Sequence, residues 1–223
     1  VVDEVVYSLQ SSNPLVDAGV QFVNIENNRQ VPKITDYPVA EWISEGDQLT
    51  ASQPTISSIK WELKDLAVLI KVQNNVLYDA KVNTERMITQ VANKAINDML
   101  LNAVLSGSGT NGEPKGIDNY QEVLEVSMGT NGAALTGYTK HTEAIKKLLE
   151  TNNGLDKISF VQNPDAFQQI ANLQIENGHY QLPPLSFQDN IVFTTAAVKA
   201  NYQQGTTAAT TRIYVGDFSK LII

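Results

Sequence analysis

The chain of 223 residues contains no cysteine, and no apolar run in it approaches the roughly 20 residues that a membrane-spanning helix needs. The lack of cysteine excludes a disulfide framework and any metal site built from thiolates. The lack of long apolar runs predicts that the protein has no membrane partner. A chain of this length can still bury a substantial core, so it is not a small scaffold stapled by disulfides.

Charged residues are also scarce, at 18 %, and the formal net charge is -8. An acidic balance disfavours a protein that grips phosphate backbones over its whole surface. The chain is rich instead in Asn and Gln, whose side chains need less energy to desolvate against a partner than charged ones do. This composition points only weakly to extensive protein contacts, and an Asn-rich protein without them fits it about as well.

Sequence motifs typical of catalytic, metal or nucleotide sites are either absent or flanked by segments that do not suit such a site. The only two histidines, His141 and His179, lack the i, i+4 spacing of a helical metal site, and each is expected in a surface or turn position. Gly107, Gly109 and Gly112 have dinucleotide-motif spacing, but they follow a predicted helix and no helix starts after them to hold phosphate. No G-x-S-x-G elbow occurs. We expect no catalytic, cofactor-binding or metal-binding residue, no cofactor and no enzymatic activity.

Two strand-like segments flank a polar tip between Glu45 and Pro54 and predict a long hairpin. The returning strand alternates apolar and polar side chains, in the order Ile59, Lys60, Trp61, Glu62, Leu63 and Lys64. This period is typical of a strand with one apolar face. A two-stranded hairpin is marginal by itself in water, so this face needs a surface from its own domain or from another subunit.

An acidic cluster opens this hairpin and consists of Glu41, Glu45 and Asp47, with Trp42 beside them. Paired carboxylates serve glycoside hydrolases and bind cations. The cluster lies at a hairpin edge, away from any predicted pocket, which favours a solvated role or salt bridges between subunits. Lys60, Lys64 and Lys71 on the returning strand are its natural counter-charges, and the alternative there is an ordinary polar strand face.

The remaining periodicity predicts a rod followed by a compact lobe. Residues 16–25 and 30–34 are expected to form strands, and residues 83–105 a helix about 30 Å long whose broad apolar stripe suits a sheet. That stripe consists of Met87, Ile88, Val91, Ala92, Ala95, Ile96, Met99, Leu100, Ala103 and Val104. After Ile117, helices alternate with short strands, with Asn163 or Asp165 as a candidate helix cap. The second half is therefore predicted to be an α/β lobe.

Several segments, in their order along the chain, resemble tailed-phage major capsid proteins of the HK97 fold. They are Ala40 to Gly46, Asn74 to Ala80, Gly107 to Ile117, Ile158 to Pro164, Asn177 to Tyr180 and Tyr214 to Phe218. Each motif alone is weak, but together they keep the same order across most of the chain. The resemblance implies an α+β, HK97-like capsid fold.

The resemblance also implies a division of the chain. Residues 1–39 would form an N-terminal arm with the first peripheral-domain strands, and residues 40–71 an extended hairpin called the E-loop. Residues 72–117 would form a peripheral domain with a spine helix at about 83–105. Residues 118–223 would form an axial domain that sits at five-fold and six-fold vertices. Members of the family continue for several dozen residues after the segment matching Gly216 to Phe218 and complete the peripheral sheet there. Those strands are expected to be missing from this chain.

The function that the resemblance implies is structural. Copies would self-assemble into pentamers and hexamers of an icosahedral shell that packages double-stranded DNA without sequence-specific binding. Further implied partners are neighbouring capsomers, a scaffolding protein or protease, and a portal; the implied location is the virion capsid, after assembly in the bacterial host cytoplasm. The candidates for contacts between subunits are Glu41, Trp42, Glu45, Asp47, Ile59, Lys60, Trp61, Leu63 and Lys64.

Some members of the family crosslink covalently through an E-loop lysine and a neighbour's asparagine, assisted by a glutamate. The position of that lysine falls near Ser58 here, with Lys60 two residues further on, and the position of the glutamate falls beyond Ile223. We therefore expect no autocatalytic crosslinking.

Two other functions remain open at the level of sequence. An encapsulin-like bacterial nanocompartment shell of the same fold would enclose cargo enzymes and would need a docking groove for cargo peptides. A hydrolase that uses the carboxylates of Glu41 to Asp47 would need those groups to line a closed pocket in the monomer.

Overall fold

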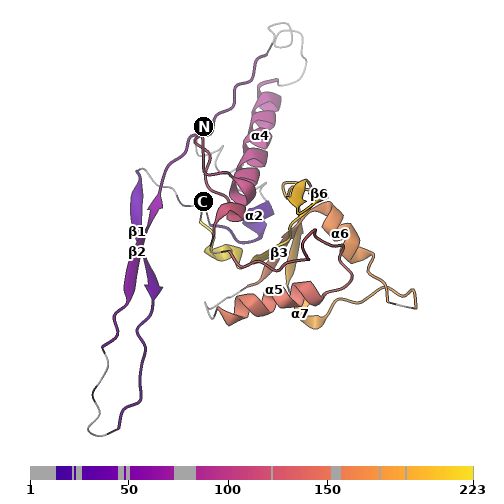
Figure 1. Ribbon diagram of the computed structural model, residues 1–223. Coiled ribbons are helices and arrows are strands. Elements are labelled where there is room, and N and C mark those ends of the chain that lie inside the picture. The colour runs from indigo at the N-terminus through magenta and orange to yellow at the C-terminus, as the bar shows by residue number, and fades with distance from the viewer. Residues whose placement is uncertain are drawn as a thin grey trace. The chain divides into compact units, whose positions relative to one another are not determined.

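The computed structural model describes residues 14–21, 23, 27–44, 48, 51–72, 84–121, 123–151, 157–175, 177–188 and 190–222. The chain divides into two compact units. One is the hairpin unit, Asn24–Asp65, and the other is the body, made of Val1–Val23 and Leu66–Ile223. Figure 1 shows the elements of both units.

The hairpin unit consists of β1 (Arg29–Asp36) and β2 (Thr55–Trp61), which pair antiparallel. The register runs from Arg29 opposite Trp61 to Asp36 opposite Thr55, with an irregularity between Ile34 and Asp36. The predicted hairpin is therefore present, but its paired part begins well before residue 40. The strand expected to continue past Trp61 stops there because β1 has no residue opposite to pair with it, and the Leu63 amide donates instead to Asn28 Oδ1 at 3.0 Å.

The strand predicted over residues 16–25 is wrong for the described part of that range. Pro14–Asp17 form the short helix α2, and Gln21 makes only an isolated bridge to Ile222. Proline is preorganised for a first helical turn, and Gly19, with φ of 100°, ends that turn at once. Leu15 is buried, so tertiary packing also holds the helical form.

The long helix α4 (Thr84–Ser106) agrees closely with the predicted 83–105. Its buried residues are Asn97, Leu101, Ala103 and Leu105, and of these only Ala103 belongs to the predicted stripe. Met87, Val91 and Met99 of the predicted stripe are exposed in the described structure. The physical reason is that, among the described residues, the core cluster packs against the C-terminal part of α4 through Leu101 and Leu105, where α2, β3 and β7 meet it.

The rest of the body contains a three-stranded sheet in the order β4-β3-β7. The central strand β3 (Ser159–Gln162) is buried along its whole length, with β4 (Ile191–Thr194) parallel and β7 (Tyr214–Gly216) antiparallel to it. The body also contains the helices α5 (Thr139–Glu150), α6 (Pro164–Ala171) and α7 (Leu185–Gln188). It further contains the hairpin of β5 (Tyr202–Gln204) and β6 (Thr207–Thr210), and the 3-10 turns η1 (Ile117–Asn119) and η2 (Phe218–Lys220).

Alternation along β3 divides the core in two. Val161 belongs to a cluster with α2, α4 and η2, and Phe160 belongs to a second cluster with α5 and α7. Successive side chains of a strand point to opposite faces, so one short buried strand joins both clusters. At the end of β3, Asn163 caps α6 by accepting a hydrogen bond from the Asp165 amide at 2.9 Å, which confirms Asn163 as the cap. The fold is α+β.

Candidate intersubunit surface

The hairpin unit exposes apolar side chains on both of its faces. Its register puts Val31, Ile59 and Trp61 on one face, and Ile34 and Ile56 on the other. Ile34 is 50 % exposed, Ile56 66 % and Ile59 47 %. The predicted alternation is present at Ile59, Lys60 and Trp61, but the face of Lys60 is not purely polar, because Ile34 of β1 lies opposite Ile56 of β2 on that side.

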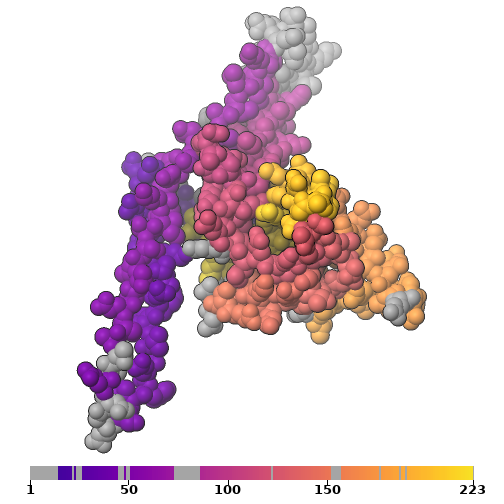
Figure 2. Space-filling view, viewed as in Figure 1, coloured from indigo at the N-terminus to yellow at the C-terminus, as the bar shows by residue number. Residues whose placement is uncertain are grey.

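Among the described residues of the hairpin unit, no helix or further strand covers these side chains. On the side seen in Figure 2, the hairpin unit is a narrow ribbon made of two strands of the chain, coloured violet. Two strands without a helix or further strands are marginally stable in water. The described part of the hairpin unit therefore has the composition of a surface that is completed by another molecule.

The chain between the strands carries further exposed apolar groups. Tyr37, Val39 and Ile43 are exposed, and Trp42 is fully open to solvent. A hydrogen bond from Ser52 Oγ to the Val39 carbonyl, 3.4 Å long, holds the two arms of this segment together beyond the strands. Aromatic side chains with such exposure are typical anchors of protein interfaces.

The structure divides the predicted contact residues into three groups. Glu41 and Trp42 lie in the exposed segment after β1, whereas Glu45 and Asp47 lie outside the described residues. Ile59, Lys60 and Trp61 lie on β2, with Lys60 on the face opposite to the other two. Leu63 and Lys64 follow the strand and are exposed, and Lys64 Nζ lies 3.1 Å from Glu62 Oε2 in a solvent-exposed pair that contributes little to stability.

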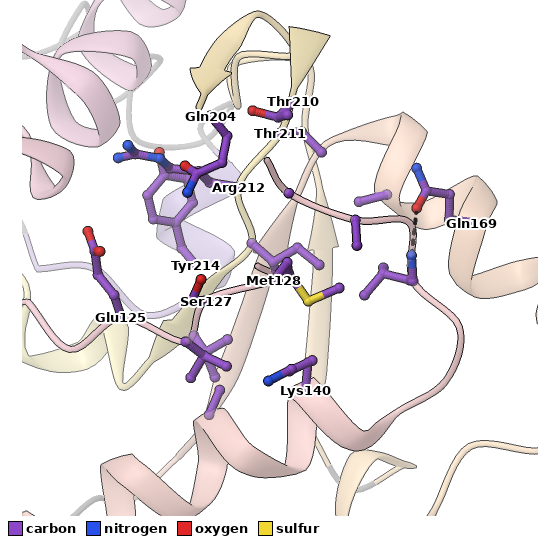
Figure 3. A pocket seen from close by; sticks show the side chains of 18 of the residues that line it. Glu125, Ser127, Met128, Lys140, Gln169, Gln204, Thr210, Thr211, Arg212 and Tyr214 are labelled. Atoms are coloured by element: carbon purple, nitrogen blue, oxygen red, sulfur yellow. Dashed lines mark hydrogen bonds between the residues drawn. The ribbon is translucent and has the colours of Figure 1, made fainter. Parts of the chain in front are cut away.

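A cavity of about 630 Å³ lies in the body, beneath the extended segment 123–136 and beside the β5-β6 hairpin (Figure 3). The cations that line it are paired: Lys140 lies 2.8 Å from Glu143, and Arg212 lies 2.8 Å from Asp118. Glu41 is not among the lining residues.

A polar network that the sequence does not predict joins η1 to the strands β5 and β7. The Asp118 carboxylate accepts hydrogen bonds from Tyr214 at 2.9 Å, from Arg212 at 2.8 Å and from Tyr202. Desolvation, together with the hydrogen bond to Tyr202 and the nearby negative charge of Asp118, raises the pKa of Tyr214 far above its ordinary value. No local pattern could have revealed the network, because its members come from distant parts of the chain.

The glycine-rich segment after α4 is a tight turn, as predicted. Glu113 accepts hydrogen bonds from the Ser108 amide at 3.1 Å and from Ser108 Oγ at 2.6 Å, and these bonds lower the pKa of its carboxyl. The Gly109 amide donates to the Pro114 carbonyl at 3.3 Å. This amide is therefore bound within the turn and does not face a phosphate site.

The two histidines differ in their surroundings. His179 is exposed, as expected, but the prediction for His141 is wrong, because only 3 % of it is exposed. Its ring lies against the rings of Phe187 and Phe160, at centroid distances of 5.3 and 5.7 Å. Neither ring nitrogen has a hydrogen-bond partner in the described structure, and burial lowers the pKa of His141.

Among the described residues, no cluster of three or more His, Cys, Asp or Glu side chains could hold a metal ion. No helix of the described part of the chain has the length and apolarity needed to cross a membrane.

The sequence matches the model of the phage capsid family over residues 1–223. No curated protein matches it. Solved structures of similar fold include the capsid of a native GTA particle, with a TM-score of 0.69 and 20 % identity over 93 % of this chain and 74 % of that one. The capsid of the empty GTA particle gives a TM-score of 0.71 and 19 % identity over 93 % of this chain and 74 % of that one. Mycobacterium phage Adephagia gives a TM-score of 0.65 and 16 % identity over 94 % of this chain and 69 % of the other.

At these identities the solved structures establish the fold, which is HK97-like, and the family model adds the family because it matches the whole chain. The hairpin exposes apolar side chains, and the cations around the cavity are already paired. Both features fit a protein that acts through contacts with other molecules. The chain belongs to the phage capsid family, as a structural protein of the virion capsid and not an enzyme.

Proposed function

We propose that copies of this protein associate through their hairpin units into pentamers and hexamers, and that these close into an icosahedral shell around double-stranded DNA. The observation that carries the proposal is the exposure of apolar side chains on both faces of β1 and β2. Fully burying one such side chain contributes about 1.5–3 kcal/mol. Covering the half-exposed Ile34, Ile56 and Ile59 would therefore stabilise an assembly by a few kcal/mol per subunit.

The nine predicted contact residues fit this role to different extents. Trp42, Ile59 and Leu63 are exposed apolar groups that a neighbour would cover, and Trp61 is half-buried on the same face as Ile59. Glu41, Lys60 and Lys64 are exposed charges suited to the rim of such an interface. For Glu45 and Asp47, the support is their sequence position in the same segment.

We also propose that the division into arm (1–39), E-loop (40–71), peripheral domain (72–117) and axial domain (118–223) holds for this chain. The last of these regions exposes Tyr180 and Leu182 between α6 and α7, and Leu185 at the start of α7. Subunits that meet around a symmetry axis would bury these side chains against one another. The segment therefore supports contacts close to the five-fold and six-fold vertices.

The further partners follow from the proposed shell. They are a scaffolding protein or protease, a portal, and DNA packaged without sequence preference, with assembly in the cytoplasm of the bacterial host. The net charge of -8 suits a shell that contains DNA without holding it tightly. A nanocompartment shell enclosing cargo enzymes is the alternative, and no particular observation of the described residues favours it.

Electron microscopy of the purified protein tests the proposal, because closed shells, isolated hexamers and monomers have distinct images. Ile56→Asp and Leu63→Asp should prevent particle formation, since each puts a charge on a surface that a neighbour must cover. Circular dichroism should show that both variants stay folded. Leu149→Asp, at an exposed position of α5, is the matched control and should still form particles. Normal particles from both hairpin variants would contradict the proposal.

A further inference from the structure

The two outer edges of the hairpin unit differ in what they offer to a further strand. Among the described residues, β1 and β2 form a sheet of two strands, so neither outer edge is paired. β1 contains Pro32, which has no amide hydrogen, and its pairing skips Thr35. Prolines and bulges are devices that keep strand edges from pairing with other chains. β2 contains no proline, glycine or acidic residue, and it is paired without interruption from Thr55 to Trp61.

Two side-chain hydrogen bonds show which backbone groups of β2 point away from β1. Ser57 Oγ donates to the Lys33 carbonyl at 3.4 Å, and Thr35 Oγ1 donates to the Thr55 carbonyl at 3.0 Å. Both carbonyls therefore point into the space between the two strands. In an antiparallel ladder, residues that bond the partner strand alternate with residues whose N–H and C=O point outward. The outward residues of β2 are Ile56, Ser58 and Lys60.

The outer edge of β2 is complementary to a second copy of itself. Antiparallel pairing about a two-fold axis at Ser58 sets this residue opposite Ser58 of the second copy, and Ile56 opposite Lys60. All of them are outward residues, so each opposite pair exchanges two backbone hydrogen bonds. The outer edge of β1 cannot do the same, because Pro32 lies opposite Ser58 in the hairpin and has no N–H at the centre of that edge.

The side chains that this pairing brings together are compatible. Lysine at an edge can repel a further strand, but Lys60 would face Ile56 and not Lys60 of the second copy, so no like charges lie opposite each other. The aliphatic stem of Lys60 would cover Ile56, which is 66 % exposed. On the other face Trp61 would lie opposite Thr55, and pairs of an aromatic with a β-branched residue stabilise sheets.

We propose that the outer edges of β2 in two copies pair antiparallel about a two-fold axis at Ser58. The two hairpins then form one continuous sheet in the order β1-β2-β2-β1. A sheet of more than two strands with apolar side chains is stable where a single hairpin is marginal. The contact rests on the proposed function, because its occupant is a second copy of this chain.

The symmetry of the contact determines which copies it joins. A contact that uses the same surface on both partners is complete after two copies, so it cannot build a ring of five or six. Such rings need contacts between different surfaces, and the faces of the hairpin remain available for them. The paired edges therefore join a copy in one ring to a copy in the next.

The lack of cysteine in the chain allows a direct test. In Ser58→Cys, the two thiols would lie on opposite residues whose Cα atoms are about 5.5 Å apart, within the range of a disulfide. Mild oxidation of assembled particles with diamide should convert at least half of the chains into dimers on non-reducing denaturing gels. No longer species should form, because each chain has one thiol.

Cysteine at a second exposed position of the same edge is the matched control. In Ile56→Cys, the two thiols would be displaced by four residues along the strands, about 14 Å, and should not join. The variant with Ile56→Cys and Lys60→Cys together should form dimers again, because these positions lie opposite each other. This pattern would fix the register as well as the contact.

Proline substitutions test the function of the paired edge. Ser58→Pro removes an outward amide and no hydrogen bond of the hairpin, as Pro32 does on the opposite strand. We expect rings by native mass spectrometry but at least ten-fold fewer closed particles by electron microscopy. Gln30→Pro, at an outward position of β1, should give normal particles. So should Ser58→Ala, which keeps the amide.

The outcomes separate this contact from the function on which it rests. The paired edge is wrong, while the shell function stands, if particles form but Ser58→Cys gives no dimers or Ile56→Cys joins as readily. The same conclusion follows if Ser58→Pro closes shells as well as Gln30→Pro. If the protein forms only dimers that Ser58→Cys joins, the paired edge stands and the shell function fails. If it forms neither dimers nor particles, both fail.

Discussion

Tyr214 donates a hydrogen bond of 2.9 Å to the Asp118 carboxylate, although the two residues are 96 positions apart in the sequence. Arg212 reaches the same carboxylate at 2.8 Å, and its guanidinium lies 4.4 Å from the centre of the Tyr202 ring. Through Asp118 the turn that follows α4 is tied to the last strand of the sheet. The Asp118 carboxylate therefore links two parts of the body that are distant in sequence.

Asp118→Ala should destabilise the protein by about 2–3 kcal/mol, because it removes the partner of a partly buried guanidinium and leaves Tyr202 and Tyr214 with only each other as hydrogen-bond partners in this network. Urea denaturation, followed by circular dichroism, measures the loss. Glu143→Gln removes an exposed partner of Lys140 and should cause no measurable change. Equal stability of the Asp118 variant and the unaltered protein would show that the network does not hold the body together.

The stability of the body should depend on pH through His141. Burial lowers the pKa of His141, so the unfolded chain binds its proton first as the pH falls. The contribution is fully present above the unfolded pKa of about 6.5 and is lost as the pH falls toward the folded pKa. Urea unfolding between pH 7.5 and 5.5 should show this decline. His141→Leu should flatten it, and His179→Gln, at an exposed position, should not; a slope unchanged in His141→Leu would assign it to other groups.

Gly107→Ala should be strongly destabilising, by about 3 kcal/mol or more. A Cβ atom there would lie 2.2 Å from the Pro114 carbonyl oxygen and 2.5 Å from that of Ala103, and both are backbone atoms that cannot swing away. Gly216→Ala is the matched control, since no atom lies within 4 Å of its added Cβ, and its change should stay within about 0.5 kcal/mol. Thermal unfolding compares the two variants, and a tolerated Gly107→Ala would mean that the turn can widen.

Assembled particles should dissociate completely into single chains on denaturing gels. The position of the family's crosslinking lysine falls near Ser58, an exposed hydroxyl residue on β2 that cannot form an amide bond through a side-chain amine. Lys60 is two residues away on the same strand face. If a covalent ladder appears, Lys60→Arg should be tested first, because loss of the ladder in that variant would identify Lys60 as the donor.

Local signals explain what the sequence could predict. The α4 helix was predictable to within a residue at each end because its apolar residues repeat at helical spacing and Gly107 stops it. The start of α6 was predictable because Asn163 and Pro164 form a cap and a first turn. The hairpin was predictable in existence from the polar tip and the alternation on β2.

Long-range packing explains what the sequence could not predict. The extent of the hairpin depends on which residues of β1 face β2, and this register is a tertiary property. The buried face of α4 is determined by partners such as Leu15 and Phe218, which come from opposite ends of the chain. His141 looked like a surface residue because nothing near it in sequence reveals the aromatic rings of Phe160 and Phe187.

The strand order β4-β3-β7 has a consequence for the timing of folding. The strand β3 remains open on one edge until residues 214–216 have been synthesised, whereas β1 and β2 can pair as soon as Trp61 is available. Local pairings form faster than distant ones, and chains fold from their N-terminus as they emerge from the ribosome. A growing chain therefore presents a paired hairpin while the sheet of its body is still incomplete. On a polysome, where several nascent copies are close together, early hairpins can meet before any body has closed.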